Sequence, residues 1–441
     1  MKILFQQEIP VKYDVDVMVA GGGPAGTAAA ISAARCGASV YLAEKSQCFG
    51  GMATIAKVPA FMRFSDGAHF LSGDIGMEIF RGLYGEEEKF TRIEYPIDTE
   101  RLKAIYDRMI QESGVSFSFE SSLTGVIQNG ETINCAVVHG REKLFAVKAK
   151  VFIDATGDGS LAVMSGADFE KGDAQGHMMP GTLCSQWGQI DWEKAVVELG
   201  KDPDNRFLKN AFQDGIFTVK DPSLPGMWKR DDGFGGGNIG HVFDVDGTSE
   251  DSITKGMLDA RKRIQEYVQY YNRYLPGYES AKLIVTADVL GIRETRRICC
   301  EYMMTAQDYF SYADFEDEIG RYCYPIDIHA AFVGDQPQYA GLYAKGYPRG
   351  RSYGISYRAL LPKKTENLLV AGRCIGADRS IMGSLRVMPG CLITGTAAGA
   401  AAAEAVNSNR TLREIDIRTL QRLLRGLGIY FHCSDQGDAA L

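Results

Sequence analysis

Three glycines near the N-terminus have the spacing that brings a peptide backbone against a diphosphate group. They lie in the run GGGPAG at residues 21–26. In such a Gly-x-Gly-x-x-Gly loop the first glycine allows a tight turn, the second lets the backbone approach a pyrophosphate, and the third lets a helix pack closely on a strand. The pyrophosphate then sits at the positive N-terminus of that helix. The predicted contacts are Gly21, Gly23, Pro24, Ala25 and Gly26.

The segments on either side of this loop are those that a dinucleotide site requires. Residues 16–20 form a short apolar run typical of a buried parallel strand, and the alanine-rich residues 27–36 predict a helix that Gly37 ends. Residues 39–43 predict a second strand, and Glu44 after it can accept hydrogen bonds from ribose hydroxyls. The three elements form a βαβ unit, which predicts nucleotide binding at this loop.

A second run with the same glycine spacing occurs at residues 235–240. The charged residues 229–232 precede it and the polar residues 244–247 follow it, so neither a strand before it nor a helix after it is expected. We therefore predict a loop without a nucleotide there.

The remaining pattern predicts an α/β protein with two domains. A helix is expected over 100–112, a β-meander over 115–151, further buried strands at 150–154 and 367–371, and helices over 390–406 and 412–427. Residues 170–360 mix aromatics, prolines and glycines around one long helix at 250–274, which favours a mixed α+β substrate domain. The predicted domains are a discontinuous nucleotide-binding domain at 11–60, 100–170 and 362–441, and a substrate domain at 61–99 and 171–361.

Composition narrows the functional classes. The 441 residues include 48 Lys and Arg against 56 Asp and Glu, a net charge of −8, which argues against a nucleic-acid partner. Ten cysteines without a CxxC pair argue against a disulfide framework, a zinc site or an iron–sulfur cluster, so no metal is expected. Residues 390–406 are too weakly apolar for a membrane span, and the N-terminus lacks the pattern of a signal peptide. We expect a cytoplasmic protein, with self-association left open.

Seven further motifs carry a resemblance to a known family. They are GGMAT at 50–54, IDATGD at 153–158, GIRETRR at 291–297, YPIDIH at 324–329, LLVAGR at 368–373, SLRVMPG at 384–390 and GTAAG at 395–399. With them the chain resembles the two-dinucleotide-binding-domain flavoproteins of glutathione reductase type, over residues 14–430. More closely, it is similar to the FAD-dependent oxidoreductases related to the heterodisulfide reductases and the thiamine-thiazole synthases. It departs from that pattern in lacking the cysteine-rich segments and the CxxxxC pair, so dithiol chemistry is not expected.

The resemblance implies a Rossmann-like FAD-binding domain with a three-layer β-β-α arrangement, and it implies contacts with FAD. Residues 50–52 would follow the pyrophosphate and ribityl chain, residues 155–157 the adenosine side, and residues 372–373 the ribityl–phosphate region. The helix that begins near Gly390 would direct its N-terminus at the flavin, and backbone near Val126 would hold the adenine. The implied contacts are Glu44, Lys45, Gly50, Gly51, Met52, Val126, Ala155, Thr156, Gly157, Asp158, Gly372, Arg373 and Gly390.

Three residues are the candidates for the substrate side of the flavin. His329 is a candidate general base, because hydride removal from an alcohol or amine needs a proton acceptor near neutral pH. Arg293 and Arg386 could bind an anionic group, and a cation near the flavin would favour its reduced form. A structural histidine and a salt-bridged turn are the alternatives for His329 and Arg293, and His69 and His241 are further candidate bases.

These residues predict hydride transfer between a small organic substrate and flavin N5, with an electron acceptor that the sequence does not identify. Two alternatives keep parts of the fold: a binding module without redox turnover, and a dehydrogenase that uses NAD only.

Overall fold

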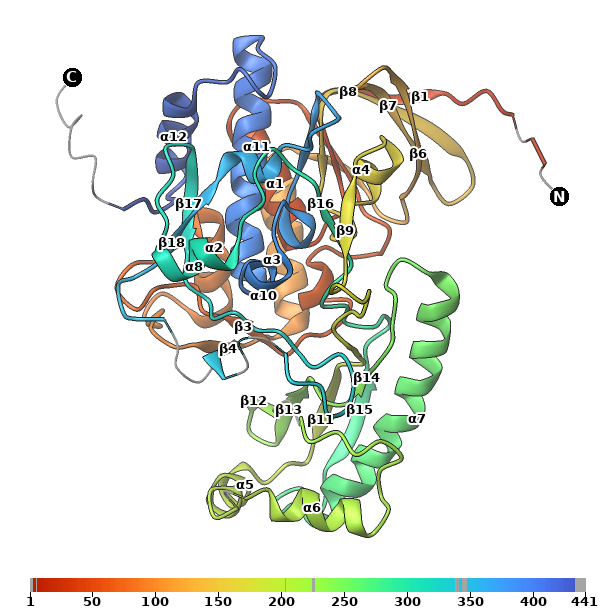
Figure 1. The fold of residues 1–441 in the computed structure, drawn as a ribbon, viewed down its shortest axis with the longest axis vertical. Coiled ribbons are helices and arrows are strands. Elements are labelled where there is room, and N and C mark those ends of the chain that lie inside the picture. The colour runs from red at the N-terminus through yellow and green to blue at the C-terminus, as the bar shows by residue number, and fades with distance from the viewer. Residues whose placement is uncertain are drawn as a thin grey trace.

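A seven-stranded sheet organises the larger part of the molecule (Figure 1). The computed structural model describes residues 3–4, 6–202, 204–223, 227–337, 339, 341–342 and 347–432. The strand order is β5-β2-β1-β8-β7-β6, and β19 pairs with the end of β8. The strands are β1 (Val11–Ala20), β2 (Val40–Ala43), β5 (Ser116–Ser118), β6 (Ser122–Asn129), β7 (Thr132–His139), β8 (Leu144–Asp154) and β19 (Leu368–Val370).

Strand β8 joins two kinds of pairing. Its first half pairs antiparallel with β7, which in turn pairs with β6, and these three strands form the predicted meander. The start of the range predicted for the meander is wrong, because β5 pairs in parallel with β2 at the other edge of the sheet. Along its other edge β8 pairs in parallel with β1 from Ala146 to Asp154, and its last residues also pair in parallel with β19. The separate strand expected at 150–154 is therefore the end of one continuous strand, because no turn interrupts residues 144–154.

The parallel strands end at one edge of the sheet. Ala20 at the end of β1 is in register with Ala43 of β2 and with Asp154 of β8, and Asp154 is in register with Val370 of β19. The loops that follow these residues contain most of the motifs found in the sequence. Ligands of open α/β sheets bind at this carboxyl edge.

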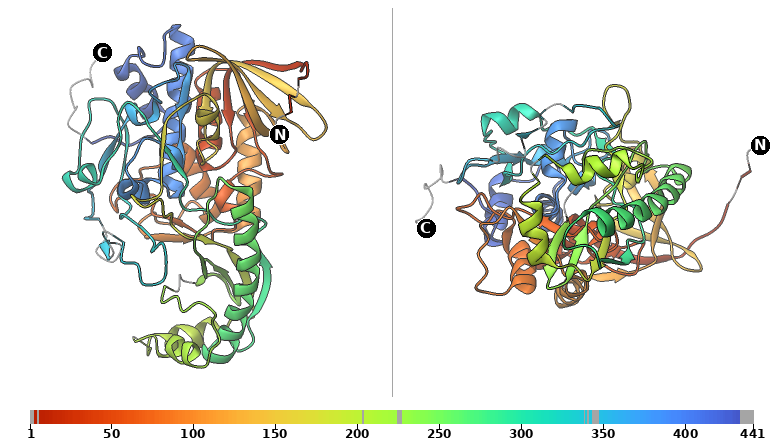
Figure 2. Two further views of the ribbon diagram at one scale, coloured as in Figure 1. Left: turned by 45° about the vertical axis from the view of Figure 1, so that its right-hand side comes forward. Right: turned by 90° about the horizontal axis from the view of Figure 1, so that it is seen from below.

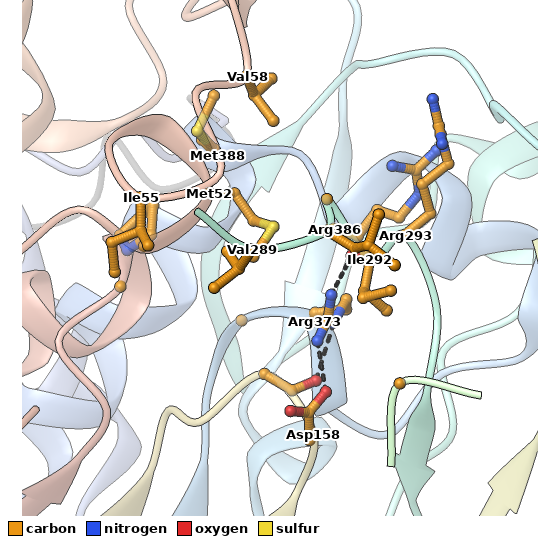
Figure 3. Close-up of a pocket in the computed structure, with 18 of the residues that line it drawn as sticks. Met52, Ile55, Val58, Asp158, Val289, Ile292, Arg293, Arg373, Arg386 and Met388 are labelled. Carbon is orange, nitrogen blue, oxygen red and sulfur yellow. Dashed lines mark hydrogen bonds and ion pairs between the residues drawn. The ribbon is translucent and has the colours of Figure 1, made fainter. Parts of the chain in front are cut away.

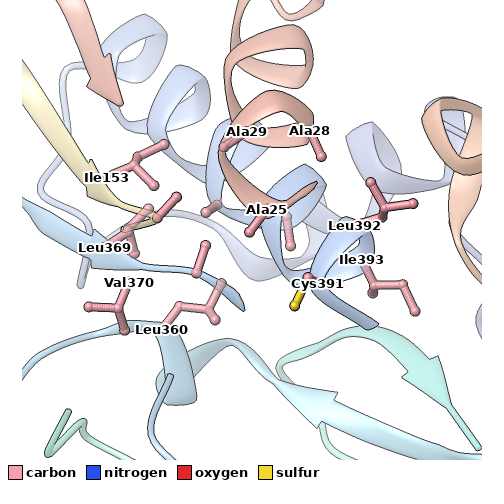
Figure 4. Close-up of a cluster of buried hydrophobic side chains, with 14 of the residues drawn as sticks. Ala25, Ala28, Ala29, Ile153, Leu360, Leu369, Val370, Cys391, Leu392 and Ile393 are labelled. Carbon is pink, nitrogen blue, oxygen red and sulfur yellow. The ribbon is translucent and has the colours of Figure 1, made fainter. Parts of the chain in front are cut away.

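Helix α1 (Pro24–Arg35) packs directly against α11 (Met388–Ser408). Figure 4 shows Ala25, Ala28 and Ala29 of α1 beside Leu392 and Ile393 of α11, next to the strands of the sheet. A Cβ atom on Gly395 or Gly399 would overlap the carbonyl oxygen of Ala25 or Ala29, so the small residues of α11 allow this close approach. None of the helices in the described part of the chain is both long and apolar enough to cross a bilayer.

A second, four-stranded sheet lies at the lower end of the molecule in Figure 1. Its order is β12-β13-β11-β15, and helix α7 (Glu250–Tyr274) lies along one side of it (Figures 1 and 2). This part has its own core, which includes Trp187, Tyr267 and Tyr271. The bounds of its other elements are β11 (Ser185–Gly188), β12 (Met227–Asp231), β13 (Phe234–Gly237), β15 (Lys282–Thr286), α5 (Trp192–Leu199) and α6 (Arg206–Gln213). We retain the predicted domain boundaries as a proposal.

The loop predicted for the second glycine run is wrong for residues 235–237. These residues belong to β13, which forms a hairpin with β12. A Cβ on Gly235 would meet the ring of Trp192, and one on Gly236 would meet Pro59. The glycines therefore allow β13 to pack closely against Trp192 and Pro59. Because both residues are distant in the sequence, the composition around residues 235–237 does not predict this strand.

The other elements connect the two sheets or cover them. The strands are β3 (Ala60–Met62), β4 (Glu94–Pro96), β9 (Phe169–Lys171), β10 (Gly181–Thr182), β14 (His241–Val242), β16 (Arg296–Ile298), β17 (Glu318–Tyr322) and β18 (Tyr353–Ser356). The helices are α2 (Gly73–Tyr84), α3 (Thr99–Glu112), α4 (Ser160–Met164), α8 (Ala306–Ser311), α10 (Arg379–Leu385) and α12 (Ile417–Gly426), and the 3₁₀ turns are η1 (Gly51–Ala53), η2 (Tyr357–Leu360) and η3 (Gly372–Cys374). The nine cysteines in the described residues are free thiols, and Cys433 lies outside those residues.

Candidate active site

A cavity of about 1540 Å³ opens at the carboxyl edge of the parallel strands. Its walls combine the loops after β1, β2, β8 and β19 with residues of the lower part of the molecule. Ligand pockets commonly measure about 300–1,000 Å³, so this cavity has room for a large cofactor together with a substrate. The predicted site residues that line it are Gly21, Gly23, Pro24, Ala25, Glu44, Lys45, Gly51, Met52, Ala155, Thr156, Gly157, Asp158, Arg293, His329, Gly372, Arg373 and Arg386.

The three glycines of the N-terminal loop meet different surroundings. Gly21 has φ +96°, and a Cβ there would lie 2.7 Å from the Ala155 carbonyl oxygen. A Cβ on Gly26 would overlap the Gly21 carbonyl oxygen, so this glycine serves the packing of α1 on the loop. A Cβ on Gly23 would have only Gly51 Cα near it, at 4.0 Å. Gly23 therefore borders open space in the cavity, as a position that receives a pyrophosphate requires.

Glu44 holds the glycine loop and the end of β2 together. Its carboxylate accepts hydrogen bonds from the Gly22 amide at 2.6 Å and from the Ser46 amide at 2.7 Å. The side chain is buried but lines the cavity. A carboxylate has about four acceptor positions, so it retains capacity for ribose hydroxyls.

Arg373 connects the loop after β8 to the segment at residue 292. Its Nη2 lies 2.5 Å from Asp158 Oδ1, its Nε donates to the Gly157 carbonyl at 2.9 Å, and its Nη1 donates to the Ile292 carbonyl. Figure 3 shows this ion pair at one wall of the cavity, with Arg293 and Arg386 farther along. The guanidinium thus fixes the shape of the wall.

Arg293 is buried against neutral partners. Its Nη1 donates to the Pro180 carbonyl and to Thr182 Oγ1, both at 2.8 Å, and its Nη2 donates to Asn238 Oδ1 at 3.2 Å. Within the described residues no carboxylate lies at ion-pair distance from it. Burial, and then the nearby Arg386, lower the pKa of Arg293 to about 10, so it is charged at neutral pH. A cation without a contacting carboxylate at a cavity wall favours an anionic ligand.

His329 lies between a carboxylate and a second histidine. Its Nε2 is 3.5 Å from Asp327 Oδ1, and Asp327 Oδ2 accepts from Arg386 at 3.0 Å. Its Nδ1 is 3.0 Å from His241 Nε2, and His241 Nδ1 is 2.9 Å from Asp221 Oδ2. Burial, and then the charge of Arg293, lower the pKa of His329 to about 4. Burial alone would raise the pKa of Asp327, but His329 and Arg386 hold it below its usual range.

Two of the residues that surround His329, Asp327 and Asp221, were not identified as site residues from the sequence. Asp327 lies in the YPIDIH motif, whose alternation of polar and apolar residues could have indicated it. Asp221 has no recognisable motif around it. His241 was only a secondary candidate, yet it contacts His329 directly. His69 instead pairs with Asp66, stacks on Tyr430 and does not line the cavity.

Several predicted contacts do not line the cavity. A Cβ on Gly50 would meet the Thr54 side chain, and one on Gly390 would meet the Leu385 carbonyl oxygen and the Tyr322 ring, so both glycines face packed protein atoms. The cavity touches the start of α11 through Val387, Met388 and Cys391, and it touches β6 at Ser122 and Leu123 in place of Val126. Gly26 is likewise absent from the lining.

The three arginines of the GIRETRR motif have different surroundings. Arg297 pairs with Glu294 and Glu170, and Arg296 donates a hydrogen bond to the Asp158 carbonyl. Of the three, Arg293 is the one that lines the cavity.

The lowered pKa of His329 predicts how stability varies with pH. The folded protein holds this imidazole neutral down to about pH 4, whereas an unfolded histidine titrates near 6.5. The unfolded chain therefore binds more protons between these values, and stability falls as the pH drops from about 6.5 to about 4. Denaturant unfolding of the apoprotein should show a loss of up to about 3 kcal/mol over this range that the His329→Gln variant lacks. Equal slopes in the two proteins would contradict the neutral, buried imidazole.

The fold and the cavity define a protein of the nucleotide-binding α/β class, with its ligand at the carboxyl ends of parallel strands. A family model described as FAD dependent oxidoreductase matches residues 16–424, and the chain belongs to this family. It is therefore an FAD-dependent enzyme. The narrower resemblance to the heterodisulfide reductases and the thiazole synthases stays a prediction.

Individual relatives share less with the chain. A digeranylgeranylglycerophospholipid reductase of Methanococcoides burtonii is 27% identical over 161 residues, which is 33% of this chain and 38% of that protein. The chain thus matches less than half the length of that relative. A geranylgeranyl bacteriochlorophyll reductase-like protein of Thermoplasma acidophilum shares the fold with a TM-score of 0.50 and 15% identity, over 95% of this chain and 84% of that one. The flavin-dependent brominase Bmp2 aligns with a TM-score of 0.46 and 14% identity, over 94% and 83% of the two chains.

The residues present fit FAD. The open position at Gly23, the buried carboxylate of Glu44 and the size of the cavity suit its pyrophosphate, its adenosine ribose and its length. In the described residues no group of three or more His, Cys, Asp or Glu side chains is arranged to hold a metal ion.

Proposed function

We propose that the enzyme removes a hydride from a small organic substrate, an alcohol or amine that carries an anionic group. The observation that carries this proposal is that His329 lines one cavity together with the cations Arg293 and Arg386, with Asp327 in contact with both His329 and Arg386. Bound FAD supplies the hydride acceptor, at flavin N5. The electrons then pass to a quinone, another flavoprotein, a nicotinamide or oxygen.

His329 receives the proton that the substrate hydroxyl or amine loses. The lowered pKa of His329 keeps the imidazole neutral, and so free to accept a proton, at physiological pH, although it also makes this histidine a weaker base than one with the ordinary pKa near 6.5. Its Nε2 lies 3.5 Å from the Asp327 carboxylate, which stabilises the imidazolium once the proton has arrived. Asp327 is itself oriented by Arg386 at 3.0 Å.

Arg293 binds the anionic group of the substrate. Its hydrogen bonds to three neutral oxygens hold the guanidinium in place without neutralising its charge. Apolar side chains such as Met52, Val289 and Met388 line the cavity as well, as Figure 3 shows, and they limit the access of water to the charged groups. This combination suits a substrate that has both an anionic group and an apolar part.

Membership of the FAD dependent oxidoreductase family disfavours both alternative functions. An enzyme that uses NAD only would not need this family's cofactor, and a binding module would not need a neutral histidine at the FAD cavity.

Anaerobic mixing of the FAD-loaded enzyme with matched pairs of compounds tests the proposed substrate class. We expect hydroxy acids or amino acids to bleach the flavin and their uncharged amides to do so about 10- to 100-fold more slowly, as the loss of a hydrogen bond to a charged group predicts. An Arg293→Gln variant should lose most of this discrimination, because glutamine keeps a polar side chain but carries no charge to attract the anionic group. Equal bleaching by the charged and uncharged members of every pair would contradict the role of Arg293.

A further inference from the structure

Asp221, His241 and His329 form a continuous chain from the protein interior to the cavity. The side chains of Asp221 and His241 are 7% and 1% exposed, whereas His329 lines the cavity. Asp221 Oδ1 accepts a hydrogen bond from the Ser223 amide at 2.9 Å, and its Oδ2 lies 2.9 Å from His241 Nδ1. Both atoms are buried, and neither forms an aligned hydrogen bond with a described residue. The contact therefore acts through charge: an ionised carboxylate 2.9 Å from Nδ1 favours the proton of neutral His241 on that nitrogen.

The protonation of His241 determines that of His329. With its proton on Nδ1, His241 presents a lone pair at Nε2, which lies 3.0 Å from His329 Nδ1. A hydrogen bond at this contact then requires the proton of His329 on Nδ1, and His329 Nε2 is left with a lone pair. The carboxylate on the other side, Asp327, favours the opposite tautomer, but it is 3.5 Å away and shared with Arg386.

We propose that Asp221, acting through His241, is a positioning residue that holds His329 in the tautomer whose Nε2 can accept the substrate proton. This inference rests on the proposed function, in which His329 is the base. When Nε2 takes the proton of the substrate, the Nδ1 proton of His329 can shift to His241 Nε2 along the 3.0 Å contact. The Asp221 carboxylate then stabilises the positive charge of His241, and no further reactant is needed.

The other charged and titratable groups around the pair are few. The charge of Arg293 opposes protonation of His329, and Arg386 forms an ion pair with Asp327. Arg263 donates a hydrogen bond to the His241 carbonyl at 2.7 Å. Tyr267 stands close enough to Asp221 for the carboxylate to influence its pKa. None of these groups contacts the two ring nitrogens that the chain joins, within the described part of the protein.

The variant Asp221→Asn is expected to reverse the tautomers of His241 and His329, and the new side chain has almost the same shape as the aspartate. The Ser223 amide continues to require an oxygen at the Oδ1 position, so the new amide group faces His241 Nδ1 as a donor. His241 must then carry its proton on Nε2, and His329 must carry its own on Nε2, where it blocks the base. The control is Asp173→Asn, which alters an aspartate–histidine pair with His177 outside the cavity.

Nitrogen NMR of the FAD-loaded, ¹⁵N-histidine-labelled protein distinguishes the tautomers without turnover. His329→Gln and His241→Gln spectra assign the two signals among the six histidines. We expect His329 protonated on Nδ1 in the wild type and in Asp173→Asn, and on Nε2 in Asp221→Asn. We also expect Asp221→Asn to slow flavin reduction by about 100-fold, with an unchanged KM, as the loss of a general base predicts.

A wild-type His329 that carries its proton on Nε2 would overturn the inference, and this outcome needs no variant to fold. An unchanged tautomer in a folded Asp221→Asn protein would overturn it as well. If the tautomer reverses but flavin reduction keeps its rate, the positioning by Asp221 stands and the proposed role of His329 as the base fails.

Discussion

Replacing His329 with glutamine is expected to slow the reduction of bound flavin by substrate about 100- to 10,000-fold, the range by which a positioned general base accelerates a reaction. Glutamine keeps a polar group at the cavity wall and can still hydrogen-bond His241, but it cannot take a proton at neutral pH. FAD content should stay at the wild-type level, because His329 makes no hydrogen bond to the glycine loop. Anaerobic stopped-flow absorbance measures the rate directly.

The matched control is His69→Gln. His69 also pairs with an aspartate, Asp66 at 3.0 Å, but it does not line the cavity. This variant should reduce its flavin at the wild-type rate. A His329→Gln enzyme that reduces its flavin as fast as His69→Gln would remove His329 from the reaction.

Adding one methyl group at Gly23 is expected to weaken FAD binding about 10- to 100-fold while the apoprotein keeps its stability. The Cβ of Gly23→Ala would meet only Gly51 Cα, at 4.0 Å, so the protein itself has room for it. The methyl group would instead occupy space next to the cofactor, and overpacking of this kind costs about 1–3 kcal/mol. Titration with FAD measures the affinity, and thermal melting of the apoprotein measures the stability.

Two other glycines give the contrast that makes this result specific. Gly26→Ala places a methyl group on the Gly21 carbonyl oxygen and should lower the melting temperature of the apoprotein itself. Gly426→Ala, in α12, adds a methyl group to open space and should leave both affinity and stability close to those of the wild type. If Gly23→Ala binds FAD as tightly as Gly426→Ala does, the glycine loop does not hold the pyrophosphate.

The convergence of the nucleotide loops could be predicted from the sequence, because a strand, a glycine loop, a helix and an acidic residue follow in a fixed order. Parallel strands bring their carboxyl ends to one edge, and Ala20, Ala43, Asp154 and Val370 are in register there. The positions of individual contacts were less predictable. Gly390 and Val126 were expected at the cofactor, but the side of a helix or strand that faces a cavity depends on packing that no local motif records.

The histidine chain shows a different limit. His329 could be chosen from its motif, but Asp221 becomes relevant only because a long connection brings it to His241. Similarly, residues 235–237 form a strand because they pair with β11 and β12, and their lack of side chains leaves room for Trp192 and Pro59. Contacts between segments distant in the sequence decide such cases, and a single sequence does not contain them.

Hydride transfer to the bound flavin is tested most directly by anaerobic single-turnover mixing of the FAD-loaded enzyme with a substrate that carries either hydrogen or deuterium at the reacting carbon. The proposed function predicts loss of the visible flavin absorbance with both substrates, and a several-fold slower loss with the deuterated one, because the carbon–hydrogen bond breaks in that step. No bleaching by any anionic alcohol or amine, or bleaching at the same rate with both isotopes, would contradict it.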